Sequence, residues 1–322
     1  MTKIFKLENL SKNNKNLYYK NGNVLTIGFF DGVHIGHKKI LSIGKKISLE
    51  TKIPFIVLTF HPHPNEIIFK NKKFPLLTSL EDRLKSIMNF NVDVIIVIPF
   101  TKEFSMMAKD EFLNEIVIKK INPKTIVIGE DFKFGYKAKG NINFLIKYLE
   151  DKKIVLKIVP LVKIDKDIIS STLIRELIKK GKVSKANNLL GRNYGIFGSI
   201  IKGEGMGRII GFPTINMKTS KELLLPGDGV YLGKIKSDGF RKYCLINIGI
   251  RPTFNGKKRT VEFHILDTEK EKVKGLMKSK ILRLYFINKL RNEIKFESVE
   301  KLVNQIKKDI KEVRKILKSK KN

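Results

Sequence analysis

The stretch GFFDGVHIGH at residues 28–37 constrains the fold more than any other part of the chain. It follows an apolar run at residues 24–27 and leads into residues 38–49, where isoleucine and leucine recur at helical spacing. The pattern predicts a strand that passes through a glycine-rich turn into a helix. Such a turn directs backbone N–H groups and the positive end of the helix dipole at one point. We therefore expect it to bind phosphate, through Gly28, Asp31, Gly32 and Gly36.

Two histidines stand at the entrance of this expected helix. His34 and His37 are three residues apart and would add side-chain donors on the same side as the turn. The alternative is that one or both only cap the helix. We favour phosphate binding, because HxGH directly after a strand is uncommon by chance.

The first half of the chain alternates between apolar runs and helical patterns. The runs at residues 54–60, 93–100, 125–129 and 154–160 predict buried parallel strands, and helical patterns lie between them at residues 80–90, 106–120 and 141–151. This alternation predicts a doubly wound α/β domain. Ligands of such sheets bind beyond the carboxyl ends of the strands, so we expect FHPHP (60–64), GEDFKFG (129–135) and ISSTLIR (169–175) to face the same pocket as the turn.

The segment ISSTLIR places hydroxyl groups where a helix is expected to begin. A serine or threonine cap alone needs no ligand. The combination of Ser170, Ser171 and Thr172 with Arg175 in the first turn favours an anion site instead. FHPHP could suggest zinc together with His34 and His37, but its flanking prolines and the lack of cysteine ligands favour a stiff pocket wall.

From Gly181 the pattern changes to short strand-like runs separated by glycine turns. These runs, at residues 194–201, 230–236, 243–248, 260–266 and 281–286, predict a small antiparallel barrel, and we place the domains at residues 1–186 and 187–322. The chain closes with an amphipathic helix that we expect to dock on the barrel and not on a membrane. Its apolar positions are Leu302, Ile306, Ile310, Val313 and Leu317.

The second half carries a phosphate-binding pattern of its own. Gly203, Gly205 and Gly207 form a flexible loop that could lay backbone N–H groups along phosphates. Thr214 and Asn216 follow, with hard oxygen atoms of the kind that Mg²⁺ accepts beside substrate phosphates. Glu262 alternates with two apolar residues, which by itself predicts only a strand carboxylate facing solvent.

Composition limits the classes of partner. The net charge of +34 comes from lysines spread over every segment, so we expect no specific nucleic-acid binding. No apolar run approaches the roughly 20 residues that span a bilayer, and the N-terminal segment lacks the apolar core of a signal peptide. The single cysteine, Cys244, fits a reducing compartment, so we expect a cytoplasmic protein. We also expect the protein to be a monomer or a weak oligomer.

Ten segments, in this order and spacing, resemble the bifunctional bacterial riboflavin kinase/FAD synthetase family. They are GFFDGVHIGH, FHPHP, GEDFKFG, ISSTLIR, LLGRNYGIFG, GEGMGRIIGFPTIN, LPGDGVY, NIGIRPTF, VEFHILD and LRNEIKF. The resemblance extends from about Val24 to the tail. It implies an N-terminal Rossmann-like nucleotidyltransferase domain and a C-terminal six-stranded riboflavin kinase barrel. It also implies phosphorylation of riboflavin by ATP to FMN, followed by transfer of AMP from a second ATP to FMN, which gives FAD and pyrophosphate.

The resemblance also implies residue roles. His34 and His37 would bind the triphosphate of the adenylyl donor, with Ser170, Thr172 and Arg175 on the leaving phosphates. Glu262 matches the catalytic carboxylate of the kinase, and Thr214 and Asn216 match its Mg²⁺–nucleotide motif. The flavin and adenine parts of the pockets would involve His61, Pro62, His63, Pro64, Asp131, Phe132 and Arg291.

The chain departs from the family pattern at a few positions. Phe29 stands where many members have asparagine, His61 replaces a usual glutamate, and PTIN replaces the commoner PTAN. The first two would lie on the flavin side of the synthetase pocket. Two alternatives are an RNA-related enzyme like the class I aminoacyl-tRNA synthetases, suggested by HxGH and by MKSK at residues 277–280, and a flavin-binding pseudo-enzyme.

Overall fold

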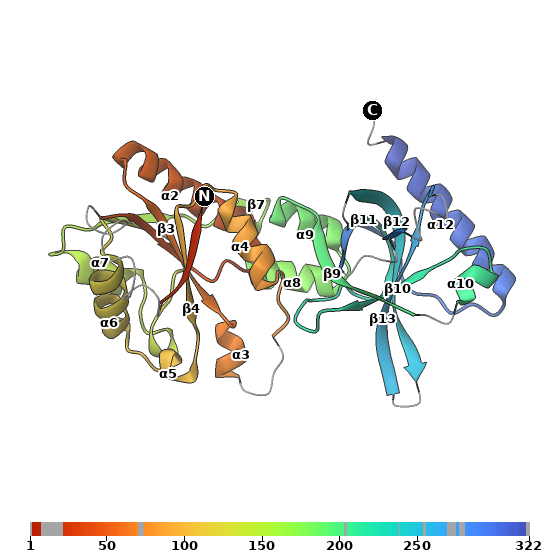
Figure 1. Cartoon of the computed structure of the whole chain (residues 1–322), viewed down its shortest axis with the longest axis horizontal. Helices are drawn as coiled ribbons and strands as arrows, with labels where there is room; N and C mark the ends of the chain where they lie inside the picture. Colours follow the sequence, from red (N-terminus) through yellow and green to blue (C-terminus); the bar gives the residue numbers. More distant parts are fainter. Residues whose placement is uncertain are drawn as a thin grey trace. The chain divides into compact units, whose positions relative to one another are not determined.

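The computed structural model describes residues 2–7, 22–69, 74–202, 205–237, 239–253, 256–268, 275–276 and 281–319. The chain forms two compact units, Met1–Ser171 and Thr172–Asn322 (Figure 1). The boundary expected from the sequence, near Asn187, lies inside helix α9 (Val183–Leu190). The two units divide after Ser171, so helix α8 (Ser171–Lys179) lies between this division and the expected boundary.

The first unit is built on a parallel sheet of six strands in the order β1-β4-β3-β2-β5-β6. The strands are β1 (Lys3–Lys6), β2 (Val24–Ile27), β3 (Phe55–His61), β4 (Val94–Pro99), β5 (Thr125–Gly129) and β6 (Val155–Val159). The doubly wound fold and the predicted strands are confirmed. The sequence reasoning missed β1, a short strand at the edge of the sheet.

The inner strands are apolar runs, and alternate strand residues point to opposite sides of the sheet. Both faces of the sheet are therefore apolar. Leu25, Ile56 and Ile96 pack against η3 and α7, whereas Val24, Val57 and Ile95 pack against α2 and α4. The helices are α2 (Ile35–Thr51), α3 (Pro64–Ile68), α4 (Leu80–Met88), α5 (Lys102–Ser105), α6 (Lys109–Glu111), η3 (Phe112–Ile121) and α7 (Ile142–Leu149), with short turns η2 (Asp31–Val33) and η4 (Tyr136–Ala138) and a hairpin of β7 (Lys163–Ile164) and β8 (Asp167–Ile168).

The second unit is a closed antiparallel barrel in the order β10-β13-β12-β11-β14-β9. Its strands are β9 (Tyr194–Ile201), β10 (Ile215–Thr219), β11 (Gly229–Ser237), β12 (Phe240–Thr253), β13 (Gly256–Ile265) and β14 (Leu282–Arg291), and the short helix α10 (Met206–Ile209) precedes β10. The six-stranded barrel implied by the resemblance is confirmed. Direct pattern reasoning missed β10.

Two helices besides α8 complete the second unit. In α9, the Asn187 side chain accepts a hydrogen bond from the Tyr194 N–H at 2.6 Å and donates one to the Phe286 carbonyl at 2.8 Å, so the helix is tied to β9 and β14. The tail forms α12 (Val299–Ser319), whose Val313 is fully buried against apolar residues of β11 and β12. The predicted docking of this helix on the barrel is confirmed. Among the described residues, no helix is long and apolar enough to cross a membrane.

Candidate active site

The predicted phosphate turn lies at the centre of the first unit. The chain passes from β2 to β3 and β4 on one side and returns to β5 on the other side of β2. The turn follows β2 at this change of direction, where open α/β sheets bind ligands. The Thr59 hydroxyl donates to the Phe29 carbonyl at 3.1 Å, and the Ser171 hydroxyl donates to the Asp31 carbonyl at 2.9 Å. The predicted segment ISSTLIR therefore contacts the turn, as does the end of strand β3 just before FHPHP.

Asp31 anchors the turn from inside the unit. Its carboxylate, 2 % exposed, accepts hydrogen bonds from the backbone N–H groups of Leu77 and Thr78 and from the Thr78 hydroxyl, at 3.0 to 3.1 Å. The Gly32 N–H donates to the same hydroxyl at 3.1 Å. These bonds give Asp31 a role in holding the turn, which is separate from the phosphate contact that the sequence predicts.

The two histidines lie against each other at the start of α2. The His34 ring caps the helix, because its Nδ1 accepts the His37 N–H at 3.3 Å, and the two rings stack with centroids 3.6 Å apart. The capping alternative is thus correct for Nδ1 of His34. It does not exclude the phosphate role, since a neutral ring whose Nδ1 accepts carries its proton on Nε2, a donor.

Two glycines of the turn lie in close contact with aromatic rings. A Cβ at Gly36 would lie 3.2 Å from the His34 ring, and one at Gly28 would lie 2.9 Å from the Phe30 ring. Gly32 has a φ of 79°, in the left-handed region that favours glycine. Larger side chains at these positions would displace the rings that form the turn.

An aromatic wall lies beside the turn. The guanidinium of Arg83 lies 3.9 Å from the centroid of the Phe29 ring, Phe29 meets the His63 ring edge-on at 4.2 Å, and His63 stacks on Phe74 at 4.0 Å. Arg83 is 1 % exposed, and burial lowers its pKa to about 10, although Asp31 and Glu66 act in the opposite direction. The departure at Phe29 therefore forms part of a continuous stack, which the sequence reasoning did not predict.

Of the predicted residues in FHPHP, His63 forms part of this wall. His63 also caps α3, accepting the Asn65 N–H at 3.0 Å, and the His61–Pro62 peptide bond is cis. Among the described residues, no group of three or more His, Cys, Asp or Glu side chains is placed to hold a metal ion.

A largely aromatic pocket of about 320 Å³ opens in the first unit, between the end of β3 and the loop after β5. Its lining includes Phe60, Pro64, Phe104 and Phe132, and Phe132 stacks on Phe134 at 5.3 Å. Two predicted residues, Pro64 and Phe132, are thus brought together, whereas Asp131 is exposed on the adjoining turn. The pocket has the flat apolar walls that an aromatic ring system needs.

The remaining residues predicted for this site lie around α8. Ser170 is half-buried just before the helix, and Ser171 is its first residue. Thr172 is exposed and Arg175 is buried, and both belong to the second compact unit. Their contact with phosphates at the turn stays a prediction.

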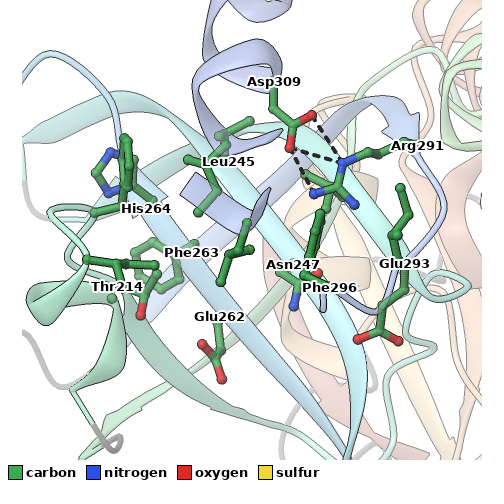
Figure 2. Close-up of a pocket in the computed structure, with 17 residues that line it drawn as sticks. Thr214, Leu245, Asn247, Glu262, Phe263, His264, Arg291, Glu293, Phe296 and Asp309 are labelled. Carbon is green, nitrogen blue, oxygen red and sulfur yellow. Dashed lines mark hydrogen bonds and ion pairs between the residues drawn. The ribbon is translucent and has the colours of Figure 1, made fainter. Parts of the chain in front are cut away.

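The second unit has its own pocket, of about 280 Å³, on the outer face of the barrel beneath α12 (Figure 2). Apolar lining comes from Val230, Leu245, Leu302 and Ile306. Polar lining comes from Thr214, Asn247, Glu262, His264, Arg291, Glu293 and Asp309. Four predicted residues, Gly207, Thr214, Glu262 and Arg291, are therefore brought to one pocket.

Strand register explains how the polar residues meet. Glu262 on β13 lies opposite Asn216 on β10 and opposite Asn247 on β12. Opposite residues of an antiparallel pair point to the same face, so the carboxylate has an amide on each side. Glu262 alternates with Val261 and Phe263, both of which are buried. The sequence reasoning gave Asn247 no role, although NIGIRPTF contains it.

The glycine loop packs against the threonine that follows it. A Cβ at Gly207 would lie 2.8 Å from the Thr214 hydroxyl oxygen and still closer to the Phe212 carbonyl oxygen. The Phe212 N–H donates a hydrogen bond to the Gly207 carbonyl at 2.7 Å. Gly205 has a φ of 79°. Gly203 lies outside the described residues. Gly207 thus sets the position of Thr214, and His264 supports the loop through a 2.9 Å hydrogen bond between Nδ1 and the Pro213 carbonyl.

At the other end of the pocket from Thr214, Arg291 forms an ion pair with Asp309 of α12 at 2.9 Å (Figure 2). The carboxylate of Glu293 lies over Gly249 of β12, where it would collide with any Cβ. Sequence reasoning missed Asp309 and Glu293. One signal for Asp309 was available, because it is an acidic residue three positions after Ile306 on the apolar stripe of the tail helix.

Two protein-family models match the chain. Residues 17–173 match the FAD synthetase family model, and residues 190–317 match the riboflavin kinase model. The tRNA-synthetase alternative rested partly on residues 277–280, which lie outside the described residues.

Curated relatives match along nearly their full length. The bifunctional riboflavin kinase/FMN adenylyltransferase of Buchnera aphidicola subsp. Schizaphis graminum is 38% identical over 315 residues, which cover 96% of each chain. Its namesake in Bacillus subtilis is 34% identical over 89% of this chain and 90% of its own. A crystal structure described as a macrolide-efflux protein from Streptococcus pneumoniae has a TM-score of 0.83 at 28% identity, covering 93% of this chain and 96% of its own.

Proposed function

The chain belongs to the family of bifunctional riboflavin kinases and FMN adenylyltransferases, and from this premise we propose where each reaction takes place. The chain phosphorylates riboflavin with ATP to give FMN, and it transfers AMP from ATP to FMN to give FAD and pyrophosphate. The kinase reaction is assigned to the pocket beside Glu262. The adenylyl transfer is assigned to the turn that carries His34 and His37, with the functional boundary kept near Asn187.

The observation that carries the kinase assignment is the row formed by Asn216, Glu262 and Asn247, in which Glu262 and Asn247 line a pocket that also has an apolar wall. Riboflavin has a flat apolar ring system and a polyhydroxylated chain. The apolar wall under α12 suits the rings, and the polar row suits the chain. Glu262 then accepts the proton of the terminal hydroxyl as its oxygen attacks the γ-phosphorus, and ADP leaves.

The donor atoms beside Glu262 fit magnesium bound with ATP. The Thr214 hydroxyl and the Asn216 amide are hard oxygen ligands, and strand register places Asn216 directly beside the Glu262 carboxylate. We assign the ion to Thr214 and Asn216, where it would neutralise phosphate charge. Gly205 and Gly207 would bring backbone N–H groups to the same phosphates.

Adenylyl transfer needs no base, because the phosphate of FMN is already a nucleophile. An FMN oxygen attacks the α-phosphorus of ATP, the bond to the β-phosphate breaks, and pyrophosphate leaves. His34, His37 and the backbone N–H groups of the turn stabilise the charge that develops. The aromatic pocket lined by Phe60, Phe104 and Phe132 is proposed to take the flavin rings, with Asp131 and the residues His61, Pro62, His63 and Pro64 at its edge.

The experiment that tests both assignments is a chromatographic assay of flavins after incubation of the purified protein with riboflavin and Mg-ATP. FMN should appear first and FAD second. Absence of FMN would contradict the proposal. Cys244 is free and buried and forms no disulfide, which fits a reducing compartment. We therefore place the enzyme in the cytoplasm.

A further inference from the structure

The ion pair between Arg291 and Asp309 joins the tail helix to the wall of the kinase pocket (Figure 2). Nε and Nη2 of Arg291 both donate to the Asp309 carboxylate, at 2.9 to 3.1 Å, in a bidentate arrangement. Asp309 is only 2 % exposed and also accepts a hydrogen bond from the Gln305 amide at 2.8 Å. Such a buried pair is held tightly, and removing one partner leaves the other charge uncompensated.

The pair is one part of a set of bonds that holds the Arg291 guanidinium to the protein. Its third nitrogen, Nη1, donates to the Asn292 carbonyl at 3.1 Å, and the guanidinium lies 5.8 Å from the centroid of the Phe296 ring. Each nitrogen of the guanidinium thus has a protein acceptor. Arg291 and Phe296 both line the pocket, and the bonds to Asp309 and Asn292 hold the guanidinium in its wall.

The pair also sets the charge that a ligand meets. Asp309 neutralises Arg291, so the other charged side chains among the described lining residues are Glu262 and Glu293, and no lysine is among them. Two acidic groups tolerate a neutral flavin. They repel a flavin that carries a phosphate dianion, by an interaction that is stronger in a partly enclosed pocket than in water.

We propose that Asp309 is a positioning residue of the kinase, which holds Arg291 in the pocket wall and cancels its charge so that the site prefers neutral riboflavin over anionic FMN. The inference rests on the proposed function of this pocket. It assigns to the tail helix a part in substrate selection and product release in addition to covering the barrel.

The test uses the full chain with Asp309→Asn, which keeps the shape of the side chain and removes its charge. We expect the KM for riboflavin to rise and product inhibition by FMN to become stronger, each by on the order of tenfold. The KM for ATP should change by less than about twofold, since Arg291 lies away from Thr214. A merely structural role would lower the amount of active enzyme without shifting riboflavin and FMN in opposite directions.

Asp267→Asn is the matched control. Asp267 pairs with Arg314 of the same helix at 2.9 Å, but both side chains are more than 60% exposed and neither lines the pocket. This variant should keep the wild-type KM for riboflavin and the wild-type inhibition by FMN. Gln305→Met, which removes only the supporting amide, should shift both values in the same directions as Asp309→Asn by a smaller factor, and it carries the test if Asp309→Asn does not fold.

A double variant isolates the effect of the Arg291 charge. Adding Arg291→Met to Asp309→Asn removes the uncompensated cation, so FMN inhibition should return towards the wild-type value although riboflavin binding stays weak. Unchanged or weaker FMN inhibition in folded Asp309→Asn would overturn the inference. A wild-type protein that forms no FMN would instead overturn the proposed function, so the two failures are distinguishable.

Discussion

The buried carboxylate of Asp31 accepts hydrogen bonds from both the backbone N–H and the hydroxyl of Thr78, which ties the phosphate turn to the loop before α4. Since Thr78 also accepts the Gly32 N–H, Thr78→Val breaks two bonds inside the unit. We expect a loss of about 1–3 kcal/mol in the free energy of unfolding, measured in urea. Thr51→Val, at an exposed hydroxyl of α2, should change it by less than about 0.5 kcal/mol.

Asp31→Asn tests the same anchor from the other side. In a double-mutant cycle with Thr78→Val, the two changes should be coupled by about 0.5–3 kcal/mol because they remove one network. Strictly additive losses would contradict the anchoring role. Tighter binding of ATP by folded Asp31→Asn would show that the carboxylate also acts on the phosphates.

The parallel strands of the first unit were predictable because each is a continuous apolar run buried on both faces, as β3, β4 and β5 show. By contrast, β1 is a short edge strand whose identity depends on pairing with β4. Strand β10 follows a loop of glycine and proline, and it is defined by its two neighbours, β9 and β13. Local pattern carries little of that information.

The same reason separates predicted from missed site residues. His34 and His37 lie in a local motif, so a phosphate role could be expected from the sequence, whereas the role of Glu262 was implied only by the family resemblance. Asn247 and Asp309 acquire their places only through strand register and helix docking, which bring together residues far apart in the chain. The stack of Arg83 on Phe29 likewise required the packing of α4 beside the turn.

Glu262→Gln should separate the two reactions. The amide cannot accept the proton of the attacking hydroxyl, so we expect FMN formation to fall by about 10²–10⁴-fold. FMN supplied directly should still be converted to FAD. Glu312→Gln, at an exposed position of α12, is the control and should leave both rates unchanged. Loss of both activities in a folded Glu262→Gln protein would refute independent sites.

His34 combines a structural and a chemical role, and two substitutions can distinguish them. His34→Ala removes the cap of α2 and should cost about 0.5–2 kcal/mol of unfolding free energy, whereas His34→Asp retains a capping acceptor. Neither side chain can donate to phosphate, so both should slow FAD formation from FMN by on the order of a hundredfold. FMN formation from riboflavin should continue. A fast His34→Asp enzyme would reduce His34 to a cap.

His37→Ala completes that comparison without touching the cap acceptor. It should also slow FAD formation, while riboflavin is still phosphorylated. Full FAD formation by His37→Ala would remove this residue from the adenylyl site.

The pH dependence of stability is expected to reflect Tyr231 in the barrel. Burial raises the pKa of Tyr231 to about 12, and its hydroxyl donates to the Gly227 carbonyl. An unfolded tyrosine releases its proton near pH 10, so between about pH 10 and 12 the unfolded chain is stabilised relative to the folded one. The contribution of Tyr231 is therefore fully present below pH 10 and is lost as the pH rises to 12, by up to ~3 kcal/mol.

Tyr231→Phe lacks this titration. At neutral pH it should be less stable than the wild type by about 1 kcal/mol, because the hydrogen bond to Gly227 is lost. As the pH rises above 10 the difference should shrink and then reverse, since only the wild type is destabilised by ionisation of this phenol in the unfolded chain. Urea unfolding of both proteins from pH 7 to 11.5 measures the difference directly, with Tyr136→Phe at an exposed position as control. A difference that stays constant across this range would contradict the raised pKa of Tyr231.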